Sequence, residues 1–209
     1  MPTKVIRRHD IKNMIRKRKE LAYMHFSFQN SVDGEPSAIP SEIYKKGRKN
    51  IDELIYNIDL ELHKYVTERE AGVWLLQIKG MDPQLAAGFL AYFDVTGKST
   101  AAQFIKYAGV NNMSAPHNNE AADILDEFMK RILSTQDSLY FDIYLTKYNI
   151  DISKGYEPSH AAVRALRYAK KVFLAHLFEE MYRVENNTPP ARNGESSNVI
   201  VEPEVPYTR

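Results

Sequence analysis

Residues 75–90 read LLQIKGMDPQLAAGFL, and this segment decides the predicted fold. Two short apolar runs flank a tight turn at Gly80, because glycine readily adopts the positive φ that such a turn requires. Asp82 stands where a helix N-cap is expected, and Pro83 suits the first helical position. The small residues at 86–88 allow two helices to approach closely. The segment therefore predicts two short helices joined by a tight turn.

Upstream of this segment the spacing of apolar residues predicts two long helices. Residues 5–29 and 41–66 carry apolar side chains at intervals of three and four, with a loop around Gly34 and Pro36 between them. Helices joined by a short loop pack antiparallel, so we expect a coiled-coil-like hairpin from Val5 to Val66. The hairpin either closes on its own core or forms a homodimer through the stripe of Ile51, Leu54, Ile58 and Leu62.

Downstream the pattern remains helical. Residues 68–110 predict three shorter helices with turns at 79–83 and 95–99, where Ser99 or Thr100 caps the helix that contains Gln103. Leu139–Tyr148 and Ser159–Val184 predict two more helices, and residues 185–209 read as a disordered tail. Alternating β-type runs are nearly absent. We therefore expect an all-α protein with a helical hairpin at 1–67, a helical domain at 68–184 and the tail.

Composition narrows the possible classes of function. The chain has 209 residues, 44% of them hydrophobic, and a net charge of +1. This small net charge is the sum of a basic N-terminal segment and an acidic C-terminal tail. Because cysteine is absent, disulfides, thiolate nucleophiles and cysteine metal sites are excluded, and we expect no metal or other cofactor. No stretch approaches the roughly 20 apolar residues of a membrane helix. A cytoplasmic protein without a membrane partner is expected.

The turn at Gly80 carries the most specific functional signal. Amides at a helix N-terminus hold a phosphate oxygen without reading sequence. The segment resembles the helix-hairpin-helix motif, whose usual turn is Gly-hydrophobic-Gly, although Asp82 replaces the second glycine. The candidate DNA-binding residues of the turn are Lys79, Gly80, Met81 and Asp82. The alternative is a turn without a ligand, in which the Asp82 carboxylate caps the helix in place of a phosphate.

Two basic runs are further candidates for phosphate contacts. His160, Arg164, Arg167 and Lys171 are spaced by four, three and four, so they share one helix face, while Ala162, Leu166, Ala169, Phe173 and Leu177 lie on another. The second run is Arg16, Lys17, Arg18 and Lys19. Each run is either a solvated basic face or a DNA-binding surface. RNA or an acidic partner would explain the N-terminal run equally well.

The order of the segments resembles the C-terminal half of Piv-type DEDD insertion-sequence transposases. Residues 104–111 (FIKYAGVN) are similar to the family's Tyr-hydrophobic-Gly-Leu segment, and residues 160–171 are similar to its closing helix. In that family a RuvC-like domain with four acidic metal ligands precedes the helical hairpin, whereas this sequence begins at the hairpin. The resemblance implies a DNA-binding protein of transposition or DNA recombination that has no catalytic activity alone. A recombinase subunit with a separate catalytic partner and a structural dimerisation protein are the alternatives.

The same resemblance supplies one catalytic candidate. The family places a reactive serine in the loop after the Tyr-hydrophobic-Gly-Leu segment, and Ser114 is the serine in the corresponding loop here. His117 lies three residues further on. A nucleophilic serine needs an organised base and oxyanion partners, so a loop or capping role for Ser114 is the alternative.

Overall fold

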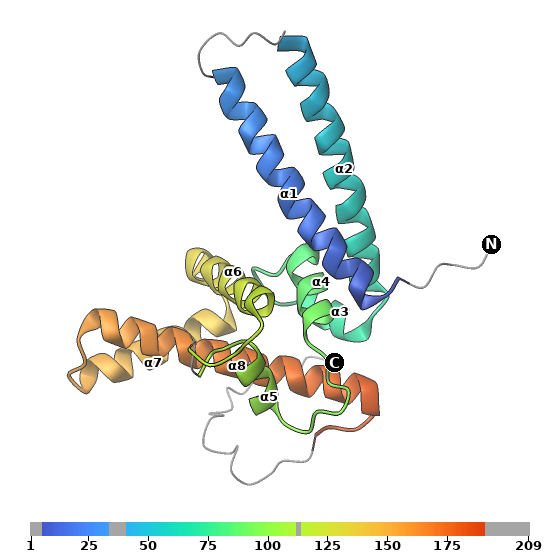
Figure 1. The fold of residues 1–209 in the computed structure, drawn as a ribbon. Coiled ribbons are helices and arrows are strands. Elements are labelled where there is room, and N and C mark those ends of the chain that lie inside the picture. Colours follow the sequence, from blue (N-terminus) through green and yellow to red (C-terminus); the bar gives the residue numbers. More distant parts are fainter. Residues whose placement is uncertain (1–5, 34–40, 112–113, 191–209) are drawn as a thin grey trace. The chain divides into compact units, whose positions relative to one another are not determined.

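The computed structural model describes residues 6–33, 41–111 and 114–190, and within these ranges the chain forms eight α-helices and no strand (Figure 1). The predicted all-α class is confirmed. The chain divides into two compact units, Met1–Phe93 and Asp94–Arg209. This division lies 26 residues beyond the expected boundary at 67/68. The reason is that α3 and α4 both contact α2, and that α4 also contacts α1. The segment at 75–93 is thus part of the N-terminal unit. The predicted tail lies mostly outside the described residues, which end at 190.

Two long helices, α1 (Arg8–Asp33) and α2 (Ser41–Thr67), form the larger part of the N-terminal unit. Two side-chain contacts join them: Arg18 donates to the Asp59 carboxylate, and the His25 Nε2 lies 3.2 Å from an oxygen of Asp52. The paired positions are seven residues apart on each helix and run in opposite directions. Seven residues are two helical turns, so both pairs lie on one side of an antiparallel helix pair.

The core of the N-terminal unit lies at the end of the helix pair that carries the start of α1. There α3 (Glu70–Leu76) and α4 (Pro83–Tyr92) pack onto α1 and α2. The buried side chains come from all four helices and include Ile11, Ile15, Leu62, Val66, Leu75, Leu85, Phe89 and Leu90. Short helices are marginal alone, and burial of α4 against the long helices therefore holds the turn at Gly80 in place.

The C-terminal unit consists of α5 (Ala101–Tyr107), α6 (Asn119–Thr135), α7 (Leu139–Ser153) and α8 (Pro158–Asn186). Aromatic contacts form its core: the ring centroids of Phe104 and Phe178 are 5.3 Å apart, and those of Phe128 and Phe173 are 4.5 Å apart. The α7 and α8 helices lie side by side along the length of α7 (Figure 1). This antiparallel pair presents the basic residues of α8.

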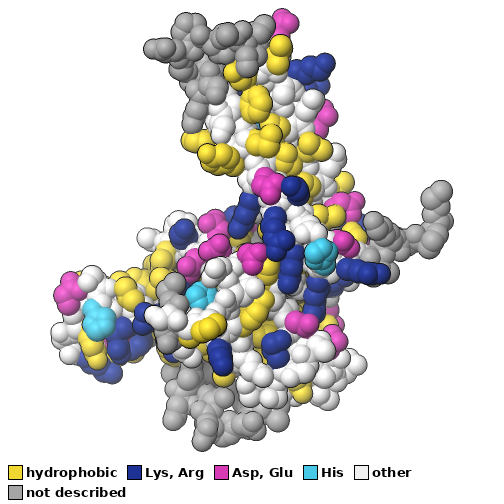
Figure 2. All heavy atoms as spheres, in the orientation of Figure 1, with side chains coloured by type: hydrophobic (Ala, Val, Ile, Leu, Met, Phe, Trp, Pro, Cys, Tyr) yellow, Lys and Arg dark blue, Asp and Glu magenta, His cyan; other side chains and the backbone are white. Residues whose placement is uncertain are grey.

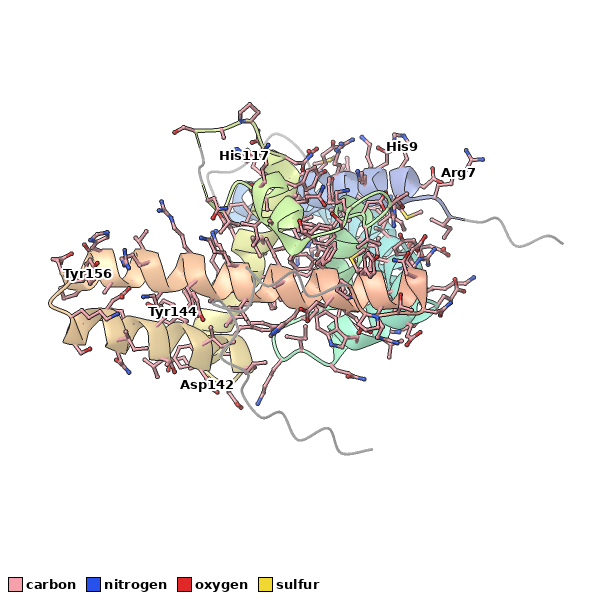
Figure 3. All side chains as sticks on the ribbon, turned by 90° about the horizontal axis from the view of Figure 1, so that it is seen from below. Arg7, His9, His117, Asp142, Tyr144 and Tyr156 are labelled. Carbon is pink, nitrogen blue, oxygen red and sulfur yellow. The ribbon has the colours of Figure 1, made fainter. Side chains whose placement is uncertain are left out.

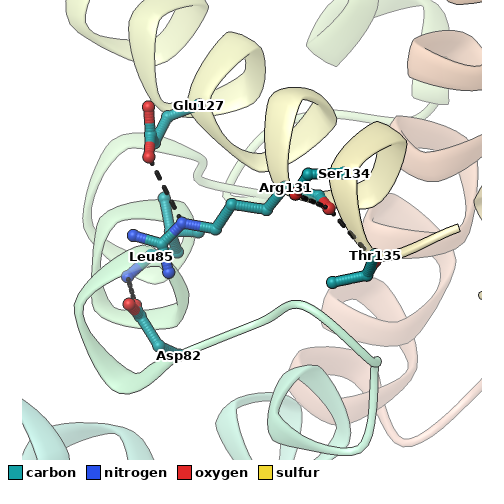
Figure 4. Close-up of polar contacts among 6 residues, drawn as sticks. All are labelled: Asp82, Leu85, Glu127, Arg131, Ser134 and Thr135. Carbon is teal, nitrogen blue, oxygen red and sulfur yellow. Dashed lines mark hydrogen bonds and ion pairs between the residues drawn. The ribbon is translucent and has the colours of Figure 1, made fainter. Parts of the chain in front are cut away.

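One helix, α6, was not predicted. Its buried residues are Ala121, Ile124, Leu125, Phe128, Met129 and Ile132, spaced alternately by three and one, and Asn118 caps its first turn by accepting the Ala121 amide at 2.8 Å. At its other end the hydroxyls of Ser134 and Thr135 donate to the Arg131 carbonyl (Figure 4). The apolar spacing of α6 was therefore present in the sequence and was missed. The predicted helix that contains Gln103 and the predicted helices at 139–148 and 159–184 correspond to α5, α7 and α8.

Candidate nucleic-acid interface

The turn between α3 and α4 has the backbone geometry that its sequence predicts. Gly80 has a φ of +88°, and Pro83 occupies the first turn of α4. The Asp82 carboxylate accepts the Leu85 amide at 2.8 Å (Figure 4), and the Met81 amide donates to the Ile78 carbonyl at 3.0 Å. Two amides near the turn thus have partners within the segment itself. This arrangement is the one expected for a carboxylate cap.

A carboxylate also caps the start of α8. Glu157 accepts the His160 amide at 3.1 Å and a hydrogen bond from the Ser159 hydroxyl. The Ser159 bond, followed by the backbone bond from His160, lowers the pKa of Glu157 below its ordinary value, so the group stays charged near neutrality. The N-termini of α4 and α8 therefore already carry an anion where a phosphate would bind. Cationic side chains are therefore better placed to bind the phosphates of a nucleic acid than the amides at these two helix ends.

The basic face of α8 divides into two kinds of residue. His160 and Arg167 are exposed and Lys171 is half-buried. Arg164 is half-buried and has partners within its own unit: its Nε donates to Asp151 at 2.9 Å, and its guanidinium lies 4.4 Å from the centre of the Tyr156 ring. Figure 3 shows Tyr156 at the end of the α7–α8 pair, where the chain turns from one helix to the other. Of the four predicted residues, Arg164 therefore has a structural role in this arrangement.

Asp151 is the residue that sequence reasoning missed. It is fully buried on α7 and is the single buried polar or charged residue within the described ranges. The Lys147 Nζ lies 2.6 Å from one carboxylate oxygen, and Arg164 binds the other. Hydrogen bonding to Lys147, supported by Arg164, lowers the pKa of Asp151 even though burial acts to raise it. The available signal was the i, i+4 spacing of Lys147 and Asp151.

The packing face of α8 is rotated from the predicted one. Ala161, Ala165 and Ala169 are buried at intervals of four, whereas Ala162 and Leu166 are half-buried. Small residues in a row allow two helices to approach closely, and α7 is the principal neighbour of α8. Phe173 and Leu177 are buried as expected. This packing leaves Arg167 and Lys171 on the side of α8 away from the alanine row.

Two residues of the basic run on α1 form ion pairs within the structure. Arg18 is paired with Asp59, and Lys17 lies 2.7 Å from Glu20. Arg16 and Lys19 are exposed, and the Arg16 guanidinium donates to Asn13 at 3.3 Å. Figure 2 shows Lys and Arg side chains gathered over the N-terminal half of α1. Lys79, at the turn before α4, is exposed in the same unit.

The Ser114 loop is shaped around Gly109. Gly109 has a φ of +68°, and a Cβ atom there would lie 2.7 Å from Cγ of His117, so the imidazole rests directly on the glycine. The His117 Nδ1 lies 2.9 Å from the Ala115 carbonyl. Ser114 is exposed, and positions 112–113 beside it lie outside the described residues. The histidine is thus positioned by the backbone of its own loop.

Within residues 6–33, 41–111 and 114–190, no group of three or more His, Asp or Glu side chains is placed to hold a metal ion. Over the same part of the chain, every helix is too short or too polar to cross a membrane.

No protein-family model matches the sequence, and no curated protein is significantly similar to it.

Proposed function

We propose that this chain is a DNA-binding protein that holds the sugar-phosphate backbone through cationic side chains without strong sequence preference. One observation carries the proposal: from Pro158 to Phe178, α8 contains four Lys or Arg residues and no Asp or Glu. Lys170 is paired with Asp126, and Arg164 with Asp151. Arg167 and Lys171 therefore remain as the principal phosphate contacts of α8, with His160 beside them. Side-chain cations of this kind supply affinity without reading bases.

The N-terminal unit supplies a second cationic surface in this proposal. Arg16 and Lys19 extend from α1, and Lys79 lies beside the turn at Gly80. Because Asp82 already caps α4, we assign the segment at 75–93 a supporting role: it places Lys79 and the Gly80 backbone beside the DNA. Gly80→Val should weaken binding by straining a position with a φ of +88°, and it removes no charge.

The first experiment is a titration of the full chain against duplex DNA, branched DNA, single-stranded DNA and RNA at two salt concentrations. Duplex and branched DNA of unrelated sequences should bind with similar affinity, and tighter at low salt, because each phosphate contact releases condensed counterions. Binding to RNA alone would replace this proposal with RNA recognition. Failure to bind any of the four at low salt would overturn it.

Ser114 tests whether the protein instead acts as a recombinase subunit with a separate catalytic partner. Ser114→Ala should leave DNA affinity unchanged within about twofold, because an exposed loop serine contributes little to phosphate binding. The measurement is the dissociation constant of wild type and variant for the same duplex. A covalent protein–DNA adduct that forms with wild type and not with Ser114→Ala would identify Ser114 as a nucleophile and contradict a purely binding role.

A further inference from the structure

One face of α1 carries cations along its first half and aromatic rings beyond them. The six residues follow one another at intervals of four, four, three, four and three: Arg8, Lys12, Arg16, Lys19, Tyr23 and Phe26. Because each residue of an α-helix turns the chain by about 100°, all six positions fall within roughly 80° of the helix circumference. They therefore form one continuous row, which we call the α1 stripe.

The α1 stripe lies on a different side of α1 from the contact with α2. Arg18 and His25, which contact α2, lie at least about 80° around the helix from the stripe. The rings at its far end are open to solvent, since Tyr23 is 74% exposed and Phe26 is 60% exposed. Figure 2 shows cations over the N-terminal half of α1, and hydrophobic side chains over the other half of the helix pair. The stripe is therefore accessible to a ligand.

The acidic residues of this part of α1 lie outside the stripe. Residues 8–26 contain two of them, Asp10 and Glu20, and neither falls within the arc of the stripe. Asp10 accepts the Arg7 amide at 3.1 Å, and a Glu20 oxygen lies 2.7 Å from the Lys17 Nζ. The stripe therefore presents positive charge with no carboxylate in its own row.

Packing against α4 fixes the cationic half of the stripe. Ile11 and Ile15 are buried beside it, and the Lys12 Nζ lies 4.8 Å from the centre of the Tyr92 ring on α4. The α4 helix itself has no charged residue. Successive cations rise by about 6 Å for each interval of four residues, so a strand that lies along α1 passes them one after another.

Cations in line with exposed rings suit single-stranded nucleic acid, whose phosphates contact cations while its unpaired bases stack on aromatic faces. The bases of a duplex are stacked on one another, so a duplex would contact the cations and leave the rings exposed. We propose that the α1 stripe binds an unpaired segment of DNA. Its four cations contact the phosphates, and the rings of Tyr23 and Phe26 stack on bases. This inference rests on the proposed function, to which it adds a site for single strands.

Fluorescence anisotropy of the full chain tests the proposal with an oligo-dT of about 15 nucleotides, within the range of single-strand site sizes, and with a duplex of equal length. Tyr23→Ala with Phe26→Ala should weaken binding of oligo-dT at least about tenfold, because both stacking surfaces are lost. Its affinity for the duplex should change by less than about twofold, since no charge is removed.

Three controls separate stacking from other contacts. Tyr23→Trp with Phe26→Trp should retain the affinity for oligo-dT, because tryptophan keeps an aromatic face, whereas leucine at both positions should lose it. Met24→Ala truncates a 46% exposed side chain about 100° around the helix from Tyr23, and it should leave the affinity unchanged. An abasic oligonucleotide keeps the phosphates and lacks the bases, so the wild-type chain should bind it more weakly than oligo-dT.

Equal affinity of the wild-type chain for oligo-dT and for the abasic strand would overturn the proposal. So would a double alanine variant that binds oligo-dT as tightly as wild type. Tighter binding of oligo-U than of oligo-dT would overturn the assignment to DNA. A chain that binds the duplex and no single strand refutes this inference alone, whereas a chain that binds neither refutes the proposed function as well.

Discussion

Gly72→Ala is expected to destabilise the N-terminal unit by about 3 kcal/mol or more, the upper end of the cost of overpacking a core. A Cβ atom at this position would lie 2.1 Å from the carbonyl oxygen of Val66 and 2.9 Å from its carbonyl carbon. Both are backbone atoms at the end of α2, so no side-chain rotation relieves the clash. The first turn of α3 would have to move away from α2. Urea and thermal unfolding, followed by circular dichroism, measure the loss.

Gly47→Ala is the matched control. Its Cβ atom would lie 3.4 Å from the Phe28 ring, which is an ordinary van der Waals contact. Replacing a glycine inside a helix by alanine stabilises the helix by about 0.5–1 kcal/mol when space allows. The two substitutions should therefore shift the unfolding transition in opposite directions. Equal shifts would show that α3 does not approach α2 as closely as the structure has it.

Arg164→Ala is expected to lower the melting temperature of the protein substantially more than Arg167→Ala. Arg164 binds the fully buried Asp151, and its loss leaves Lys147 as the remaining partner of that carboxylate. A buried charge that loses a partner keeps its desolvation cost. The Arg167 side chain is exposed, so its truncation removes little from the folded state. Differential scanning calorimetry at pH 7 compares the two variants, and equal melting temperatures would contradict the role assigned to Arg164.

The pH dependence of stability gives an independent check on Asp151. Hydrogen bonds from Lys147 and Arg164 lower the folded-state pKa of Asp151 below its ordinary value, so folding favours the charged carboxylate. The resulting stability is present above that value and is lost as the pH falls through the lowered pKa. Asp151→Asn should be less stable at neutral pH and should lose less stability on acidification than wild type. If the stability of the two proteins fell in parallel as the pH is lowered, the stabilising role of the Asp151 charge would be contradicted.

The sequence was informative where local chemistry determines the structure. Gly80, Asp82 and Pro83 have the conformation and the capping role that their residue types predict. The Gln103 side chain likewise accepts the amides of Ser99 and Thr100, at 2.9 and 3.4 Å, in the cap expected before α5. These features depend on residues close together in the chain, so the pattern contains the whole interaction.

Tertiary contacts explain most of what was missed. The spacing of His160, Arg164, Arg167 and Lys171 correctly places them along one side of α8, yet it cannot show that Asp151 on α7 binds one of them. The position of Ala161 rather than Ala162 against α7 depends on how closely those two helices approach. The unit boundary depends similarly on the contacts of α4. The omission of α6 has a different reason, since its apolar spacing is a local pattern that could be recognised in the sequence.

The most direct test of the proposed function compares the salt dependence of DNA binding in two double variants. The first variant, Arg167→Ala with Lys171→Ala, removes two α8 cations that do not contact Asp151. The second variant, Lys45→Ala with Lys49→Ala, removes the same number of charges from α2. The logarithm of the duplex-DNA association constant is measured against the logarithm of salt concentration for each protein. The α8 variant should flatten the wild-type slope by about two units, one for each lost phosphate contact, and the α2 variant should leave it near the wild-type value. An α8 variant with unchanged affinity and an unchanged slope would contradict DNA binding through α8.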